Sequence, residues 1–215
     1  MPYRLTPFQT DHFYHVYNRG VEKRQVFSSQ RDYERFLQTI YYYQFSGPKP
    51  KLSTYKRFKF KEFYNNPKIV EIVCYCLMPN HFHFLLKQVK ENGIQEFMSK
   101  LSNSYAKYFN TKHKRVGPLW QGQFKAISVD SDEQLIHLSR YIHLNPIVAD
   151  LTNDLTNFEY SSYNEFIDLN NRNFSSPESI LSYFSDNNTY KDFVKNYEAS
   201  AKDLHLIKSL LLDQN

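Results

Sequence analysis

The sequence predicts an α+β protein in which strands and helices are interleaved. Runs of aromatic and branched residues, bounded by turn signals, favour strands at residues 12–20, 69–87 and 119–129. Apolar residues recur at helical spacing at residues 31–45, 93–113 and after Asp130. With 215 residues, of which 41% are hydrophobic and 23% are charged, the chain can bury a core and suits one domain with an appendage.

The first strand and the first helix have recognisable end signals. Asn18, Arg19 and Gly20 end the strand at 12–20. Ser28 or Ser29 can cap the helix at 31–45, and Gly47-Pro48 stops it.

The segment 69–87 predicts a hairpin that turns at Met78-Pro79-Asn80. Because side chains alternate along a strand, His81, His83 and Leu85 share one face, and Phe82, Phe84 and Leu86 share the other. The two imidazoles then lie about 7 Å apart at Cβ, so both can reach one divalent cation. Such a pair on its own is more often a satisfied core or surface pair than a metal site.

Cys74 and Cys76 lie just across the predicted turn and are too close on one strand to form a comfortable disulfide. They are typical of a reducing compartment. With His81 and His83 they also allow a closed Cys₂His₂ zinc site, although buried neutral cysteines explain the pattern equally well.

A helix should begin at Asp130-Ser131, where Ser131 and Gln134 have capping-box spacing. We expect it to end near Asn145, because the residue before a proline is pushed away from helical geometry. Leu135, Leu138 and Ile142 form its core stripe. A second, polar stripe has the spacing of four that stacks side chains on one face, and it consists of His137, Tyr141 and Asn145. His143 is expected at the surface.

The charge is unevenly distributed. The formal net charge is +5, but residues 1–150 carry 22 Lys and Arg against 12 Asp and Glu, whereas residues 151–215 carry 5 against 10. A basic surface with interleaved aromatics is typical of nucleic-acid binding. The segment 49–68 is one such stretch, although a solvated hairpin would have the same composition. The predicted contacts are Lys56, Arg57, Lys59, Lys61, Lys112, Lys114, Arg115 and Trp120. For Trp120, a place in the core is the commoner role.

No charged segment followed by an apolar one opens the chain, and no apolar run reaches about 18 residues. We therefore expect neither export nor a membrane span, and the expected location is cytoplasmic.

Three motifs in order carry a family resemblance: Pro79-Asn80-His81-Phe82-His83, then Trp120-Gln121-Gly122, then Tyr141-Ile142-His143-Leu144-Asn145-Pro146. The set resembles the single-tyrosine HUH transposases of the IS200-like family, in particular the REP-associated branch, over about residues 10–165. The resemblance implies a ferredoxin-like or RRM-like antiparallel sheet with helices on one face. We expect residues 1–165 to form this domain, and residues 166–215 to form an acidic helical appendage with helical pieces at 180–184, 190–197 and 204–212.

The resemblance also implies roles for single residues. His81 and His83 match the metal ligands, Tyr141 matches the nucleophile, and Asn145 matches a polar residue that can complete the metal shell in relatives. The implied chemistry is cleavage and rejoining of single-stranded or hairpin DNA through a 5′-phosphotyrosine, with Mg²⁺ or Mn²⁺ and with zinc chemically possible. A homodimer and association with the nucleoid through DNA are further implications. The alternative is a nucleic-acid-binding domain on the same fold that has lost turnover.

Overall fold

The computed structural model describes residues 7–47, 52, 66–170 and 174–196. The core elements are β1 (Phe13–Arg19), α1 (Gln30–Tyr43), β2 (Val70–Met78), β3 (His81–Gln88), α3 (Gly93–Lys112), β4 (Lys125–Val129) and α4 (Asp132–Val148). Shorter elements are the 3₁₀ turns η1 (Val21–Lys23) and η3 (Leu155–Asn157) and the helices α5 (Tyr163–Phe166), α6 (Glu178–Leu181) and α7 (Asn187–Lys195). The predicted basic segment 49–68 falls mostly outside the described residues, as does the helical piece at 204–212.

The four strands form one antiparallel sheet in the order β2-β3-β1-β4. With α1 between β1 and β2 and α3 between β3 and β4, this is the βαββαβ arrangement of the ferredoxin-like fold. The α+β class with an antiparallel sheet predicted from the sequence is confirmed, whereas the helices lie on both faces of the sheet and not on one as expected, because α4 packs on the face opposite to α1 and α3. The strand predicted at 119–129 is shorter than expected, since β4 covers only its last five residues.

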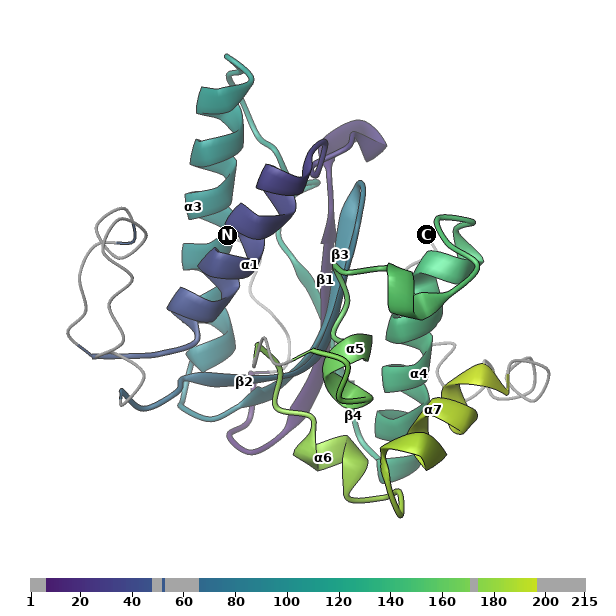
Figure 1. Cartoon of the computed structure of the whole chain (residues 1–215). Coiled ribbons are helices and arrows are strands. Elements are labelled where there is room, and N and C mark those ends of the chain that lie inside the picture. Colours follow the sequence, from purple (N-terminus) through teal and green to yellow (C-terminus); the bar gives the residue numbers. More distant parts are fainter. Residues whose placement is uncertain (1–6, 48–51, 53–65, 171–173, 197–215) are drawn as a thin grey trace.

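The two core helices α1 and α3 cover one face of the sheet (Figure 1). Phe82, Phe84 and Leu86 of β3 point into this layer, as their alternation predicted. They meet apolar side chains of both helices, among them Phe36 and Phe97. Each fully buried aromatic ring of this kind contributes about 1.5–3 kcal/mol through removal from water, so this layer fixes which side of β3 faces inward.

The opposite face is covered by α4 and the C-terminal helices (Figure 1). Leu85 of β3 lies in this second apolar cluster with Leu135, Leu138 and Ile142 of α4, the predicted core stripe. The side of β3 that carries His81 and His83 therefore faces α4 rather than solvent. The domain boundary at residue 165 stays a prediction.

The helix α4 does not end near Asn145 as the sequence predicted; it continues through Pro146 to Val148. The proline lacks the N–H that would bond to Ile142 O. The Asn145 side chain partly replaces that donor, since its Nδ2 lies 2.8 Å from Tyr141 O and 3.5 Å from Ile142 O. The proline therefore removes one backbone hydrogen bond near the end of α4 without ending the helix.

A buried polar network joins α4 to the C-terminal segment, and its centre is His143, which is fully buried and not at the surface as expected. Its Nδ1 lies 2.8 Å from the Tyr190 hydroxyl of α7, and its Nε2 lies 2.8 Å from Ser162 Oγ. Ser162 Oγ in turn accepts a hydrogen bond from the backbone N–H of Tyr75 on β2. One imidazole thus links a strand, α4 and α7.

Among the helices that the structure describes, none combines the length and the apolar character that crossing a bilayer requires.

Candidate active site

His81 and His83 lie side by side on β3, and both face α4. Their ring centroids are 4.9 Å apart and the ring planes are nearly perpendicular. His83 is fully buried, whereas His81 is partly exposed near the hairpin turn. The orientation predicted from strand alternation is confirmed.

A third histidine, His15 of β1, joins them from the neighbouring strand. Its Nε2 lies 3.0 Å from His83 Nδ1, and the two rings stack at 5.2 Å. The sequence reasoning missed His15 as a site residue. The available signal was a histidine between the aromatic and apolar residues of a predicted strand. In the structure His15 is buried and lies on the same face as Tyr17, which pairs with His83 in the sheet.

Tyr141 reaches these imidazoles from α4. Its ring stands edge-on to His83 at 5.7 Å between centroids, and edge-on to His15 at 6.3 Å. The side chain is partly buried. Packing of the core stripe of α4 on the sheet therefore brings the Tyr141 ring to His83 and His15 within a single chain.

Burial determines the charge of the two β3 histidines. It lowers the pKa of His81 to about 4, with a further contribution from the neighbouring Arg19 charge. Burial also lowers the pKa of His83 well below its ordinary value, with smaller contributions from His81 and His15. Both imidazoles are therefore neutral at neutral pH, which is the form that ligates metals.

The arrangement fits a divalent cation in one further respect. His83 Nε2 is buried and has no hydrogen-bond partner within the part of the chain that the structure describes. Its other nitrogen, Nδ1, is occupied by His15. If Nδ1 carries the proton, Nε2 presents a lone pair, and an outer hydrogen bond of this kind usually fixes the tautomer of a ligating histidine.

The position of Asn145 gives less direct support for a metal ligand than the positions of His81 and His83 do. Its amide nitrogen is bonded to backbone carbonyls of α4, and in the described structure Asn145 hydrogen-bonds to neither His81 nor His83. Across the described ranges no group of three or more His, Cys, Asp or Glu side chains is arranged to hold a metal. The predicted role of Asn145 in a metal shell stays a prediction.

Cys76 pairs with His83 across the sheet, but among the described residues the cysteines and histidines do not form a group that could hold a metal. Both thiols are fully buried, and burial raises the pKa of Cys74 and of Cys76, which keeps them protonated. Cys76 Sγ lies 3.6 Å from Met78 Sδ. The structure thus favours buried neutral cysteines over the Cys₂His₂ zinc alternative.

Four of the eight predicted nucleic-acid contacts lie among the described residues. Lys112 is bonded to Asp32, Lys114 is exposed, and Arg115 donates to Asn110 Oδ1. Trp120 is buried in the core, and its indole N–H donates to a backbone carbonyl, so it takes the structural role that is commoner for tryptophan. The other four, Lys56, Arg57, Lys59 and Lys61, lie outside the described residues.

A ferredoxin-like sheet that brings paired imidazoles and a phenol to one face defines a candidate site for nucleophilic chemistry. The model of the family "Transposase IS200 like" matches residues 51–145, the segment that holds His81, His83, Tyr141 and Asn145. This match confirms, over residues 51–145, the resemblance to the IS200-like transposases that the motifs predicted.

Two solved structures were found to be similar to this chain. A REP-associated tyrosine transposase, solved bound to a REP hairpin, shares 12% identity, with 82% of this chain and 89% of that chain covered and a TM-score of 0.49. A protein from Deinococcus radiodurans R1, solved as a candidate transposase, shares 16% identity over 65% of this chain and 95% of that chain, with a TM-score of 0.36. No curated protein matches the sequence.

Proposed function

We propose that the protein is a single-tyrosine DNA transposase that cleaves and rejoins single-stranded DNA, including hairpin-flanked DNA, through a covalent link to Tyr141. The observation that supports this most directly is the meeting of the Tyr141 ring with His83 at 5.7 Å. The site residues also lie inside the segment that matches the IS200-like family.

In the proposed reaction the Tyr141 oxygen attacks the phosphorus of the scissile phosphodiester. A Tyr141 O–P bond forms and the P–O3′ bond breaks. The phenol proton is lost and the leaving 3′ oxygen gains a proton, which gives a 5′-phosphotyrosine and a 3′-hydroxyl. The 3′-hydroxyl of another strand can attack the same phosphorus and release Tyr141. The energy of the broken bond is kept in the covalent link, so no nucleotide cofactor is needed.

His81 and His83, with Asn145 as the predicted third ligand, would hold Mg²⁺ or Mn²⁺. When bound, the ion would supply charge stabilisation at the phosphate under attack. His15 would hold the His83 ring and its tautomer through the 3.0 Å contact. Arg19 pairs with His81 across the sheet, and its guanidinium would add a fixed positive charge where the phosphate enters.

The contact between Tyr141 and the histidines concerns whether one chain alone can form the proposed site. Because the phenol reaches the histidines of its own chain, the proposed reaction can proceed in cis, and a homodimer is not needed to complete the site.

The test is formation of a covalent protein–DNA adduct. Wild-type protein is incubated with labelled hairpin-flanked single-stranded oligonucleotides and Mn²⁺, and the products are separated under denaturing conditions. We expect an adduct with wild type and none with Tyr141→Phe. A matched control is Tyr183→Phe, which removes a hydroxyl from a side chain that is 46% exposed and should leave the adduct unchanged.

Two outcomes contradict the proposal in different ways. An adduct that survives Tyr141→Phe would show that another residue is the nucleophile. DNA binding by wild type without an adduct on any substrate would favour the nucleic-acid-binding domain that lacks turnover.

A further inference from the structure

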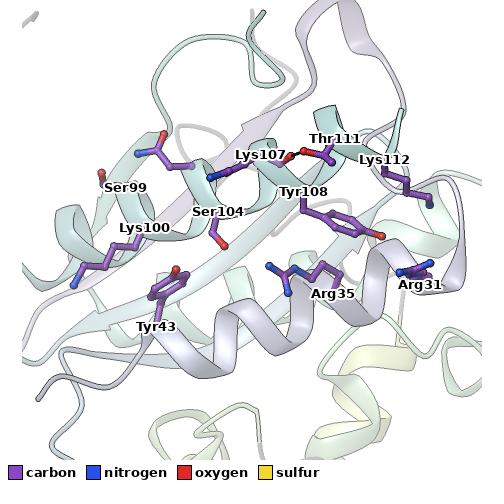
Figure 2. A pocket seen from close by; sticks show the side chains of 11 residues that line it. Arg31, Arg35, Tyr43, Ser99, Lys100, Ser104, Lys107, Tyr108, Thr111 and Lys112 are labelled. Carbon is purple, nitrogen blue, oxygen red and sulfur yellow. Dashed lines mark hydrogen bonds between the residues drawn. The ribbon is translucent and has the colours of Figure 1, made fainter. Parts of the chain in front are cut away.

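A groove of about 990 Å³ lies between α1 and α3, and Figure 2 shows the side chains that line it. These two helices cover the face of the sheet opposite to α4, which carries Tyr141. Five cationic side chains line the groove and no carboxylate does; the cations are Arg31, Arg35, Lys100, Lys107 and Lys112. All the other lining residues are Ser, Thr, Asn or Tyr, whose side chains can donate hydrogen bonds. The lining therefore favours an anionic ligand.

Two of the five cations are compensated from within the chain. Lys112 Nζ lies 2.7 Å from the fully buried carboxylate of Asp32, and Lys100 Nζ lies 2.6 Å from Glu96. The other three form no ion pair with any residue that the structure describes. The groove therefore has an excess positive charge concentrated at Arg31, Arg35 and Lys107.

Arg35 is the least satisfied of these three. Its Nε is buried and has no hydrogen-bond partner among the described residues, and its guanidinium lies 5.4 Å from the ring centroid of Tyr108. Figure 2 shows Arg35 of α1 and Ser104 of α3 both pointing into the gap between the two helices. A buried donor without a partner costs about 1–3 kcal/mol, more for a charged group, and an incoming anionic oxygen would remove that cost.

The length of the groove suits a polymer better than a single anion. Its lining on α3 runs from Ser99 to Lys112, which at 1.5 Å per residue is about 20 Å. Phosphates on one strand of a DNA duplex recur about every 3.4 Å along the axis, so about six of them span this length.

We propose that the groove between α1 and α3 binds the phosphodiester backbone of DNA that flanks the cleaved segment. Naming DNA as the ligand rests on the proposed function; the anionic character of the ligand does not. The sheet separates the groove from Tyr141, so the groove would hold a portion of the substrate that is not cut. In this arrangement one face of the sheet performs the reaction and the other retains the DNA.

The test compares DNA affinity across salt concentrations for wild type, Lys107→Glu and Arg35→Gln, using a fluorescent hairpin with a single-stranded flank. Lys107 is exposed, so its replacement should not disturb folding, and thermal unfolding checks this for Arg35→Gln. The control is Lys195→Gln, which removes an exposed charge from α7 on the other side of the sheet. Adduct formation by each variant is measured in parallel on a short unflanked single strand.

We expect Lys107→Glu and Arg35→Gln to bind the hairpin more weakly, and each to reduce the slope of log affinity against log salt. The reduction should be about 0.9 per lost contact if the occupant is duplex and about 0.7 if it is single-stranded. Lys195→Gln should match wild type, and adduct formation on the short strand should be unchanged in all three variants.

Unchanged affinity and slope in both groove variants would overturn the groove proposal while leaving the proposed function intact. Weaker binding by these variants, in a protein whose wild type forms no adduct, would support the groove and count against the proposed function. Tighter binding of an RNA of the same sequence than of the DNA, lost in the same variants, would overturn DNA as the occupant.

Discussion

His15 Nε2 lies 3.0 Å from His83 Nδ1, and this contact joins two neighbouring strands inside the candidate site. Neutral imidazoles can make such a contact only when one nitrogen donates and the other accepts. The contact therefore restricts the tautomers of both rings, and it leaves His83 Nε2 as the nitrogen without a partner among the described residues.

Replacing His15 should weaken metal binding without removing a proposed ligand. His15→Leu keeps much of the side-chain volume but removes the hydrogen bond to His83. Loss of an outer partner of a ligating histidine typically costs about 10–100-fold in metal affinity or activity. We expect that loss in Mn²⁺ affinity, measured by titration calorimetry, and a matching fall in the rate of adduct formation.

The matched control is His12→Leu, because His12 is exposed and directly precedes β1, the strand that carries His15. It should bind Mn²⁺ like wild type. Mn²⁺ affinity that is equal in His15→Leu and wild type, with both folded, would rule out a positioning role for His15.

The link between α4 and α7 should contribute measurably to stability. Tyr190→Phe removes the hydroxyl that contacts His143 Nδ1 at 2.8 Å and Ser139 Oγ at 3.1 Å. All three residues are buried, so the change leaves polar atoms without a partner, at a cost of about 1–3 kcal/mol. Urea unfolding should show this loss in the free energy of unfolding, whereas the exposed Tyr183→Phe should stay within about 0.5 kcal/mol. Equal effects of the two variants would contradict the role given to this network.

Strand alternation alone was enough to assign the two faces of β3. Phe82 and Phe84 are apolar and bulky, whereas His81 and His83 are polar, so only one orientation buries the rings against two helices. The position of Tyr141 on α4 followed from the same kind of periodicity. These parts of the fold and the site are set by local pattern, and the structure agrees with them.

The features that were missed depend on contacts between distant segments. Nothing in the sequence near His15 indicates that its strand will lie beside β3, so its pairing with His83 appears only once the sheet is assembled. The burial of His143 could not be predicted from its local sequence, because its partners Ser162 and Tyr190 are distant along the chain. The extension of α4 past Pro146 likewise depends on where the side chain of Asn145 donates.

The carboxylate of Asp32 should be important for the start of α1. It is fully buried and accepts hydrogen bonds from Lys112 Nζ at 2.7 Å, Tyr108 OH at 2.9 Å and Ser29 Oγ at 2.9 Å. Burial raises the pKa of Asp32, but these bonds outweigh burial and hold its pKa below the usual range. Asp32→Ala removes the acceptor that these three donors share with the backbone N–H of Ser28, which lies 3.1 Å from Asp32 Oδ2, and we expect a loss of about 3 kcal/mol in urea unfolding.

Glu34→Ala is the matched control for Asp32→Ala, since Glu34 is an exposed acid on the same helix, and it should change stability by less than about 0.5 kcal/mol. Lys112→Met should cost less than Asp32→Ala, because the lysine side chain is 29% exposed and the carboxylate keeps its other donors. A larger loss in Lys112→Met than in Asp32→Ala would show that leaving the buried carboxylate without its cation costs more than removing its hydrogen bonds.

His143 should make the protein less stable in acid. Burial lowers the pKa of His143 to about 3 in the folded chain, whereas an unfolded histidine titrates near about 6.5. Between these values the unfolded state binds one more proton, so the free energy of unfolding falls as the pH falls from about 6.5 towards 3, by up to about 1.4 kcal/mol per pH unit for this group. Above about pH 7 the group adds no pH dependence.

His81 and His83 also have a lowered pKa, so they add to the pH dependence of stability in the wild type. The contribution of His143 is therefore measured as the difference between wild type and His143→Asn. The free energy of unfolding in urea is determined for both at pH 7.5, 6.5 and 5.5. The variant should be less stable at pH 7.5 but lose less stability on acidification, and parallel curves would show that His143 takes up its proton without unfolding.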